Sequence, residues 1–175
     1  MKSDVVTIDN KGHGIEEAKA ETKKFAEFRK LSEIETLHLQ LCAEEMLCLA
    51  RSITGEMEAS FWIENQDKKF DLHMTTKTVM DKTKRDLLIA ASSERKNEAT
   101  KSFLGRIRNA FEEAMISETE TYTYTPDISQ EDLANRAVDA SDWDQYEQSV
   151  LRKVADGIKV SISGKTVDLT VEKSF

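Results

Sequence analysis

The chain has 175 residues, of which 39% are hydrophobic and 33% charged, and its formal net charge at pH 7 is −8. This length and apolar content suit one domain with a single core. The acidic excess argues against binding of nucleic acid or an anionic membrane by the surface as a whole. No apolar run approaches the roughly 18 residues that a membrane helix needs, and the first residues contain no apolar signal-peptide core. We therefore expect a cytoplasmic protein.

The N-terminal part of the chain predicts a strand and then a helix. Residues 5–8 form a short run rich in β-branched side chains, which ends in a turn that contains Gly12 and Gly14. A phosphate-binding loop at these two glycines is the weaker alternative to a plain turn. Residues 15–30 have helical periodicity, with an inward stripe of Ile15, Ala18, Thr22, Phe25, Ala26 and Leu31.

The next segment predicts a long central helix. Ser32 and Glu35 have the spacing of a capping box, about twenty residues without proline or glycine follow, and Gly55 is suited to end the helix. Apolar residues occur nearly all round this segment, which is typical of a buried helix. Glu44 and Glu45 lie side by side in its middle, and burial of both without partners would be costly. These two glutamates are therefore the clearest hint of a site.

From residue 59 onward the apolar period changes to two. Two segments, 59–75 and 158–172, each contain two alternating runs around a polar turn, which is typical of β-hairpins with one apolar face. The inward residues of the two hairpins are Phe61, Ile63, Phe70, Leu72, Met74, Ile158, Val160, Ile162, Val167, Leu169 and Val171. We expect an α+β fold, a two-layer sandwich of a mixed or antiparallel sheet with helices on one face and water on the other.

The segment between the hairpins predicts mainly helices. Residues 81–92, 93–115 and 143–155 have helical patterns, and a loop at 117–130 precedes a short helix that ends at 138. We expect a single domain, 1–175, in which residues 81–140 form a lid-like helical insertion.

Several groups of residues in the chain are candidate sites. A basic stretch that comprises Arg95, Lys96, Lys101, Arg106 and Arg108 suggests either a phosphate or nucleic-acid contact or a solvated helix face, and the solvated face is favoured in so acidic a protein. The three histidines are scattered, so no metal site is expected. Cys42 and Cys48 are six residues apart on the predicted helix and cannot bridge; we expect them to fill core space in a reducing compartment.

The order of these elements resembles the histidine-kinase-like ATPase fold (the GHKL group), and within it the anti-sigma regulatory-factor serine kinases of bacteria. The resemblance covers nearly the whole chain and is carried by three stretches: LCAEEMLCLA, FWIENQDKKFDLHMTTKTVMD and SVLRKVADGIKVSISGKTVDLTVEKSF. It implies a nucleotide site between the long helix and the sheet. In the family, a glutamate on that helix orients or activates a water, and an asparagine four residues later helps to hold magnesium.

The resemblance places Glu45 at the catalytic acid and Leu49 at the asparagine position. Leucine has no oxygen for magnesium, which prefers oxygen ligands. The adenine box, D-x-G-x-G in the family, falls on residues 76–80, where Thr76, Thr78 and Met80 stand in place of the aspartate and the two glycines.

The phosphate loop of the family has two partial matches in this chain. The nearer one lies at residues 102–107, with Gly105 as its one glycine and Arg106 beside it, and the alternative at residues 146–149 has none. Backbone amides that bind phosphate at a helix start need such glycines. The sequence therefore departs from the family at all three nucleotide-binding boxes.

Three hypotheses follow from the sequence. The first is a bacterial regulatory module that binds another protein, sigma-factor-like or signalling, without kinase activity and without a cofactor. The second is an ATP- and magnesium-dependent serine protein kinase or ATPase with unusual boxes. The third is a binder of nucleic acid or another anion through residues 95–108. We favour the first, with residues 81–140 as the partner surface, no membrane contact, and a homodimer left open.

Overall fold

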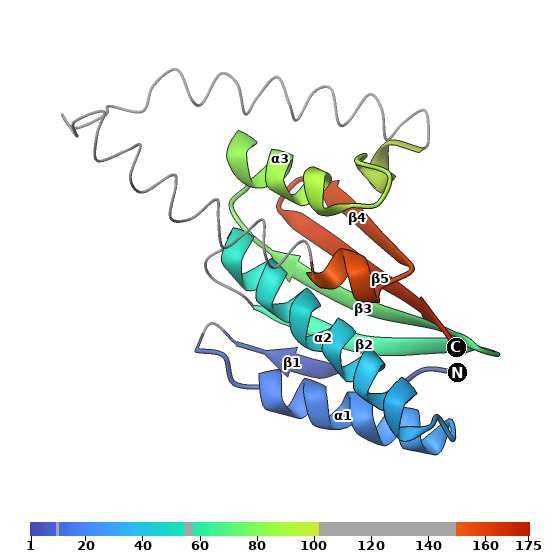
Figure 1. The fold of residues 1–175 in the computed structure, drawn as a ribbon. Helices are drawn as coiled ribbons and strands as arrows, with labels where there is room; N and C mark the ends of the chain where they lie inside the picture. Colours follow the sequence, from blue (N-terminus) through green and yellow to red (C-terminus); the bar gives the residue numbers. More distant parts are fainter. Residues whose placement is uncertain (10, 55–57, 102–149) are drawn as a thin grey trace.

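The computed structural model describes residues 1–9, 11–54, 58–101 and 150–175, which form an α+β fold (Figure 1). In chain order its elements are β1 (Val6–Ile8), α1 (Ile15–Phe28), α2 (Glu33–Thr54), β2 (Ala59–Gln66), β3 (Lys69–Lys77), α3 (Lys82–Ala91), the short 3₁₀ helix η1 (Glu98–Lys101), β4 (Gly157–Ser163) and β5 (Thr166–Ser174). Residues 150–154 form a further helical segment before β4.

The strands form one five-stranded sheet in the order β1-β2-β3-β5-β4, and every neighbouring pair is antiparallel. The two predicted hairpins are confirmed as β2–β3 and β4–β5. Each hairpin has a two-residue turn. The first residue of each turn has a positive φ, 55° for Asp67 and 61° for Gly164. Aspartate and glycine are among the residues that best tolerate this conformation.

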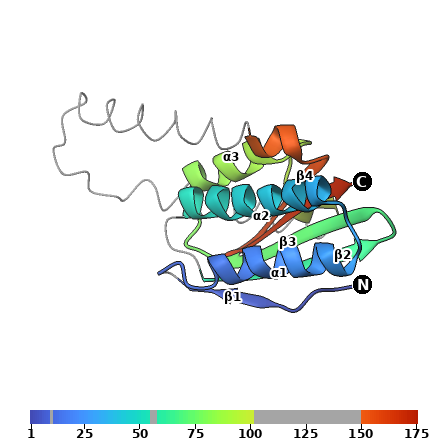
Figure 2. The ribbon, with the colours of Figure 1, turned by 60° about the horizontal axis from the view of Figure 1, so that its bottom comes forward.

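The helices lie on one face of the sheet and leave the other face open (Figures 1 and 2). Residues alternate along each strand, so one set of side chains meets the helices and the other meets solvent. Every inward hydrophobic residue predicted for the two hairpins is at most 2% exposed. The predicted α+β layering is thus confirmed, with an antiparallel sheet.

The central helix begins as predicted, at a capping box. The Ser32 amide donates to Glu35 Oε2 at 2.7 Å, and the Glu35 amide donates to Ser32 Oγ at 3.3 Å. The inward side of α2 is fully buried, with Leu39, Cys42, Ala43, Met46, Leu49 and Ala50 all at most 1% exposed.

The expectation that α2 is buried all round is wrong for its outer side. Ile34 and Leu37 are 67% and 63% exposed, and the Cys48 thiol is exposed as well. The helix covers the sheet on one side only, so an apolar sequence pattern that continues round the helix leaves these side chains facing water.

The prediction of a helix from residue 93 is wrong for residues 93–97, which instead close the outer edge of β4. Ser93 exchanges two hydrogen bonds with Ile158: its amide donates to the Ile158 carbonyl at 2.9 Å, and its hydroxyl accepts from the Ile158 amide at 2.8 Å. The side-chain amide of Asn97 does the same for Ile162, at 3.0 and 2.8 Å. Serine and asparagine side chains that bond to backbone compete with helix formation.

The helix predicted at 81–92 is confirmed as α3, which Asp81 caps by accepting from the Lys84 amide at 2.8 Å. Three other predictions lie outside the described residues: the loop at 117–130, the short helix that ends at 138, and the part of the 93–115 helix beyond residue 101. Most of the helix predicted at 143–155 also lies there.

Candidate functional site

The two helix positions of the family's site lie one turn apart on the same side of α2 but differ in burial. Glu45 is half-buried, with Glu44 exposed beside it. Leu49 is 0% exposed and belongs to the core that joins α2 to the sheet. At the position of the magnesium-holding asparagine the protein therefore has a packed aliphatic side chain.

The positions of the adenine box take part in holding the sheet together. Thr76 is 1% exposed, and its hydroxyl donates to the Glu58 carbonyl at 2.8 Å. The Thr78 amide donates to the Lys165 carbonyl at 2.9 Å, which ties the end of β3 to the turn of the last hairpin. Met80 is partly buried against the core. Each of these groups already has a structural role.

The structure describes five of the predicted site positions, namely Glu45, Leu49, Thr76, Thr78 and Met80. The phosphate-loop candidates are not among the described residues. Gly105, Arg106 and residues 146–149 lie outside them. Arg95 and Lys96 of the basic stretch are exposed, and Arg95 has a positive φ of 50°. A continuous basic helix over 95–108 is therefore excluded at its first residues.

The open face of the sheet carries a polar cluster that sequence reasoning did not assemble. Trp62 on β2 and His73 on β3 are directly paired across the strands, and their rings are stacked, with centroids 5.1 Å apart and an interplanar angle of 15°. Lys2 Nζ lies 4.3 Å from the centroid of the Trp62 ring, a cation–π distance. We call Lys2, Trp62, Glu64, His73 and Thr170 the Trp62–His73 cluster.

Hydrogen bonds hold this cluster in place. The Trp62 indole donates to Glu64 Oε1 at 3.0 Å, and His73 Nδ1 lies 3.1 Å from the Thr170 hydroxyl. Lys2 Nζ is 3.4 Å from the same Glu64 oxygen. On the next row of the face, the Thr75 hydroxyl donates to Asp168 at 2.7 Å.

The electrostatics of the cluster follow from partial burial and from these partners. Desolvation lowers the pKa of His73, against the nearby carboxylates of Glu64 and Asp71, which raise it. The hydrogen bond from Trp62 lowers the pKa of Glu64. At neutral pH the stack therefore contains a neutral imidazole beside an ionised carboxylate.

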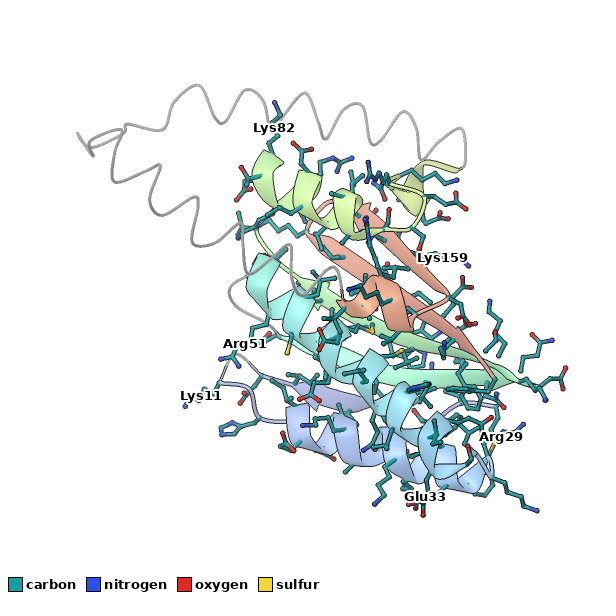
Figure 3. The ribbon with its side chains drawn as sticks, viewed as in Figure 1. Lys11, Arg29, Glu33, Arg51, Lys82 and Lys159 are labelled. Atoms are coloured by element: carbon teal, nitrogen blue, oxygen red, sulfur yellow. The ribbon has the colours of Figure 1, made fainter. Side chains whose placement is uncertain are left out.

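A second charged group on this face centres on Glu172. Burial acts to raise the pKa of Glu172, but hydrogen bonds from Lys159 and Lys69 outweigh it, so the pKa is lowered. Its carboxylate lies 2.6 Å from Lys159 Nζ, and Figure 3 labels that lysine on β4. Lys69 also lies 3.4 Å from Asp71.

Burial limits the chemistry that the His73 imidazole can perform. Its Nε2 is buried, has no hydrogen-bond partner and lies 4.0 Å from Glu64 Oε2. A general base needs its nitrogen within hydrogen-bond reach of the proton that it removes. The stacked ring is thus suited to packing and to pH response more than to proton transfer with a substrate.

The two cysteines have different environments. Cys42 is buried as predicted, and burial raises the pKa of its thiol to about 11. The expectation that Cys48 also fills the core is wrong, because its side chain lies on the outer side of α2. The buried Cys42 thiol is a poor nucleophile, because its pKa is far above neutral pH.

The alternation of apolar and polar residues along the strands assigns Trp62 and His73 to the open face, but it does not show that their rings are in contact. Whether the two rings meet depends on the register of β2 against β3, which places Trp62 opposite His73. A shift of one residue would reverse the faces. The pairing is therefore a property of the folded sheet.

Comparison with known proteins identifies no family. None of the protein-family models matches this chain, and no curated protein matches it either. In the part of the chain that the structure describes, no helix is long and apolar enough to cross a membrane. The same residues contain no group of three or more His, Cys, Asp or Glu side chains that could hold a metal ion.

Proposed function

We propose that the protein is a bacterial regulatory module that binds another protein, built on a histidine-kinase-like ATPase scaffold that does not transfer phosphate. The proposal is supported by the order of the elements: a strand, two helices, a hairpin, a helical segment and a final hairpin. A sheet with helices on one face agrees with this scaffold, but a fold does not carry its function with it.

The observation that carries the proposal is the burial of Leu49. Its side chain is 0% exposed at the position where the family places a magnesium ligand. Magnesium is bound by oxygen atoms in near-octahedral geometry and gives up its waters reluctantly, and an aliphatic side chain offers it nothing. The Thr76 hydroxyl, at the position of the adenine-contacting aspartate, is already used by the Glu58 carbonyl.

The partner surface in this proposal is the insertion at residues 81–140, in the place of the family's lid. Within its described part, residues 81–101, α3 packs on the core through Leu88 and Ala91 and leaves Lys82, Thr83 and Asp86 exposed. A sigma-factor-like or other signalling protein would be the partner. Segments that connect the elements of a rigid scaffold often carry binding functions.

Thermal unfolding with nucleotide tests the loss of phosphate transfer. We expect millimolar ATP or ADP, with or without magnesium, to leave the melting temperature unchanged. A ligand at a hundred times its dissociation constant would stabilise the fold by about 2.7 kcal/mol, which corresponds to a rise of roughly 5 degrees or more for a domain of this size.

The variants Glu45→Gln and Glu44→Gln sharpen this experiment. A magnesium-dependent rise that disappears in Glu45→Gln but persists in Glu44→Gln would contradict the proposal and support the ATP-binding kinase. A rise that both variants retain would place nucleotide elsewhere. Binding of a labelled single-stranded oligonucleotide that weakens steeply with salt would support the anion-binding alternative.

A further inference from the structure

The first three residues of the chain pair with the edge of β2 beyond the end of β1. Lys2 lies opposite Glu64 in an isolated antiparallel bridge. Ser3 exchanges two hydrogen bonds with Ile63: its amide donates to the Ile63 carbonyl at 2.8 Å, and its hydroxyl accepts from the Ile63 amide at 2.9 Å. We call residues 1–3 the strap.

The strap is held separately from β1. Lys2 is opposite Glu64 and Val6 is opposite Phe61, so over this stretch the chain has one residue more than β2 does. An extra residue of this kind is a β-bulge, which interrupts the ladder of hydrogen bonds. The strap can therefore open while β1 stays paired.

The Lys2 side chain anchors the strap to the open face of the sheet. Its Nζ lies 4.3 Å from the centroid of the Trp62 ring and 3.4 Å from Glu64 Oε1, the oxygen that also accepts from the Trp62 indole. β3 pairs with the other edge of β2, so His73 reaches the Trp62 ring from the opposite side. Trp62 and Glu64 thus lie between Lys2 and a second group that can carry a positive charge.

Carboxylates surround His73 on the same face. They belong to Glu64 on β2, Asp71 on β3, and Asp168 and Glu172 on β5. Lys69 and Lys159, the cations that bind Glu172, are also strand residues. All these groups stay in the sheet when the strap opens, whereas Lys2 leaves with the strap.

We propose that protonation of His73 releases the strap in mild acid, because it sets a second positive charge against the groups that hold Lys2. The sign of the effect follows from linkage. Burial is the main influence that lowers the pKa of His73, and the charge of Lys2 lowers it further. Coupling between two sites is reciprocal, so a proton on His73 weakens the attachment of Lys2 by the same factor. This inference does not depend on the proposed function.

The surroundings of His73 Nε2 supply the structural route. In the imidazolium both ring nitrogens donate, but this nitrogen is buried without a hydrogen-bond partner. Glu64 Oε2 is 4.0 Å away, and a shift of about 1 Å would bring it within hydrogen-bond distance. The hydrogen bond from Trp62 lowers the pKa of Glu64, so the carboxylate is still ionised in mild acid. Its movement toward the ring draws it away from Lys2.

Amide hydrogen exchange of the full chain, followed by NMR, tests the release. The Ile63 amide donates to Ser3, and the Asn65 amide donates to the Met1 carbonyl at 2.7 Å. Protection of these two amides, corrected for the exchange rate of an unstructured chain, should fall roughly two- to fivefold between pH 7.5 and a pH below the midpoint of the His73 titration, the scale of one exposed ion pair. They should also be less protected than the amides of β3, which lies between β2 and β5 and exchanges only when the sheet unfolds.

Two histidine variants assign the effect. His73→Gln should keep the Ile63 and Asn65 amides equally protected at both pH values, because the ring that titrates is gone. His38→Gln, at an exposed histidine on α2, should show the same fall as the wild type.

Lys2→Gln tests the coupling from the other side. Loss of its charge should raise the pKa of His73, measured from the imidazole resonances, and should leave the Ile63 and Asn65 amides weakly protected at both pH values. Lys11→Gln, at an exposed lysine in the turn between β1 and α1 that Figure 3 labels, should change neither quantity.

Three outcomes would overturn the inference. The first is equal protection of the Ile63 and Asn65 amides on both sides of the His73 titration, or protection as high as that of β3. The second is a fall in protection that persists in His73→Gln. The third is an unchanged pKa of His73 in Lys2→Gln, because the coupling would then be absent.

Discussion

The imidazole of His73 lies nearly parallel to the indole of Trp62, with the ring centroids 5.1 Å apart. The two residues are cross-strand partners on the open face of the sheet, where aromatic pairs contribute to sheet stability. The stack covers a titratable ring at a place that would otherwise be in water. It therefore links the stability of the sheet to pH.

Replacement of His73 by glutamine should flatten the dependence of stability on pH. Burial lowers the pKa of His73 below its usual 6.5, while the unfolded chain keeps the usual value. Between 6.5 and the lowered pKa the unfolded state binds more protons, so the free energy of unfolding falls as the pH falls through this window. Urea unfolding at pH 7.5 and 5.5 should show a larger loss for the wild type than for His73→Gln.

Two further measurements test the cause of this pH dependence. His38→Gln, at an exposed histidine, should keep the wild-type dependence. Trp62→Ala should raise the pKa of His73, followed by its imidazole proton resonances in NMR, because the ring becomes solvated. Equal pH dependence in the wild type and His73→Gln would show that the stack does not respond to pH.

Asn97→Ala should destabilise the protein and expose the edge of β4. The Asn97 side chain is 5% exposed and satisfies both the amide and the carbonyl of Ile162. Leaving a buried polar group without a partner costs about 1–3 kcal/mol, and an open strand edge promotes aggregation. We expect a loss of at least about 2 kcal/mol in urea unfolding and more light scattering on heating. Lys96→Ala, at an exposed neighbour, should do neither.

Gly14→Ala should destabilise the turn between β1 and α1. Gly14 has a φ of 91°, and a Cβ there would lie 2.2 Å from the Thr7 carbonyl oxygen, which is backbone and cannot move aside. Such a backbone costs an L-residue about 1–2 kcal/mol before the clash is counted. Gly157→Ala is the matched control, since its Cβ would meet the end of the Glu172 side chain. Unfolding midpoints that are lowered equally would contradict this reasoning.

Leu49→Asn should not restore a magnesium site and should weaken the core. Leu49 is 0% exposed, so the substitution removes packed aliphatic atoms and buries an amide. Losses of about 2–5 kcal/mol accompany removal of buried leucine side chains, and we expect the urea midpoint to fall accordingly. Glu45→Gln, on a half-buried residue of the same helix, should have a smaller effect. Magnesium-dependent binding of ATP by the Leu49→Asn protein would show that the pocket survives.

Local chemistry in the sequence determined much of the scaffold. The two-residue alternation predicted both hairpins and assigned their hydrophobic residues to the inner face, because side chains on a strand point to opposite sides in turn. The capping box of Ser32 and Glu35 located the start of α2, because both partners lie within one helical turn. The α+β layering followed from these elements.

Only the tertiary structure decided which distant groups meet. Ser93 and Asn97 lie in a segment with a helical pattern, yet they bond to Ile158 and Ile162, 65 residues further along the chain. The pairing of Trp62 with His73 depends on the register that the two-residue turn at Asp67 and Lys68 sets, and the polar run at residues 65–69 did not show which two residues form that turn. The exposure of Ile34 and Leu37 was hidden for the same reason: an apolar residue looks alike in the sequence whether the sheet covers it or not. The partners of a side chain are set by packing between segments, and that information appears only when the chain is folded.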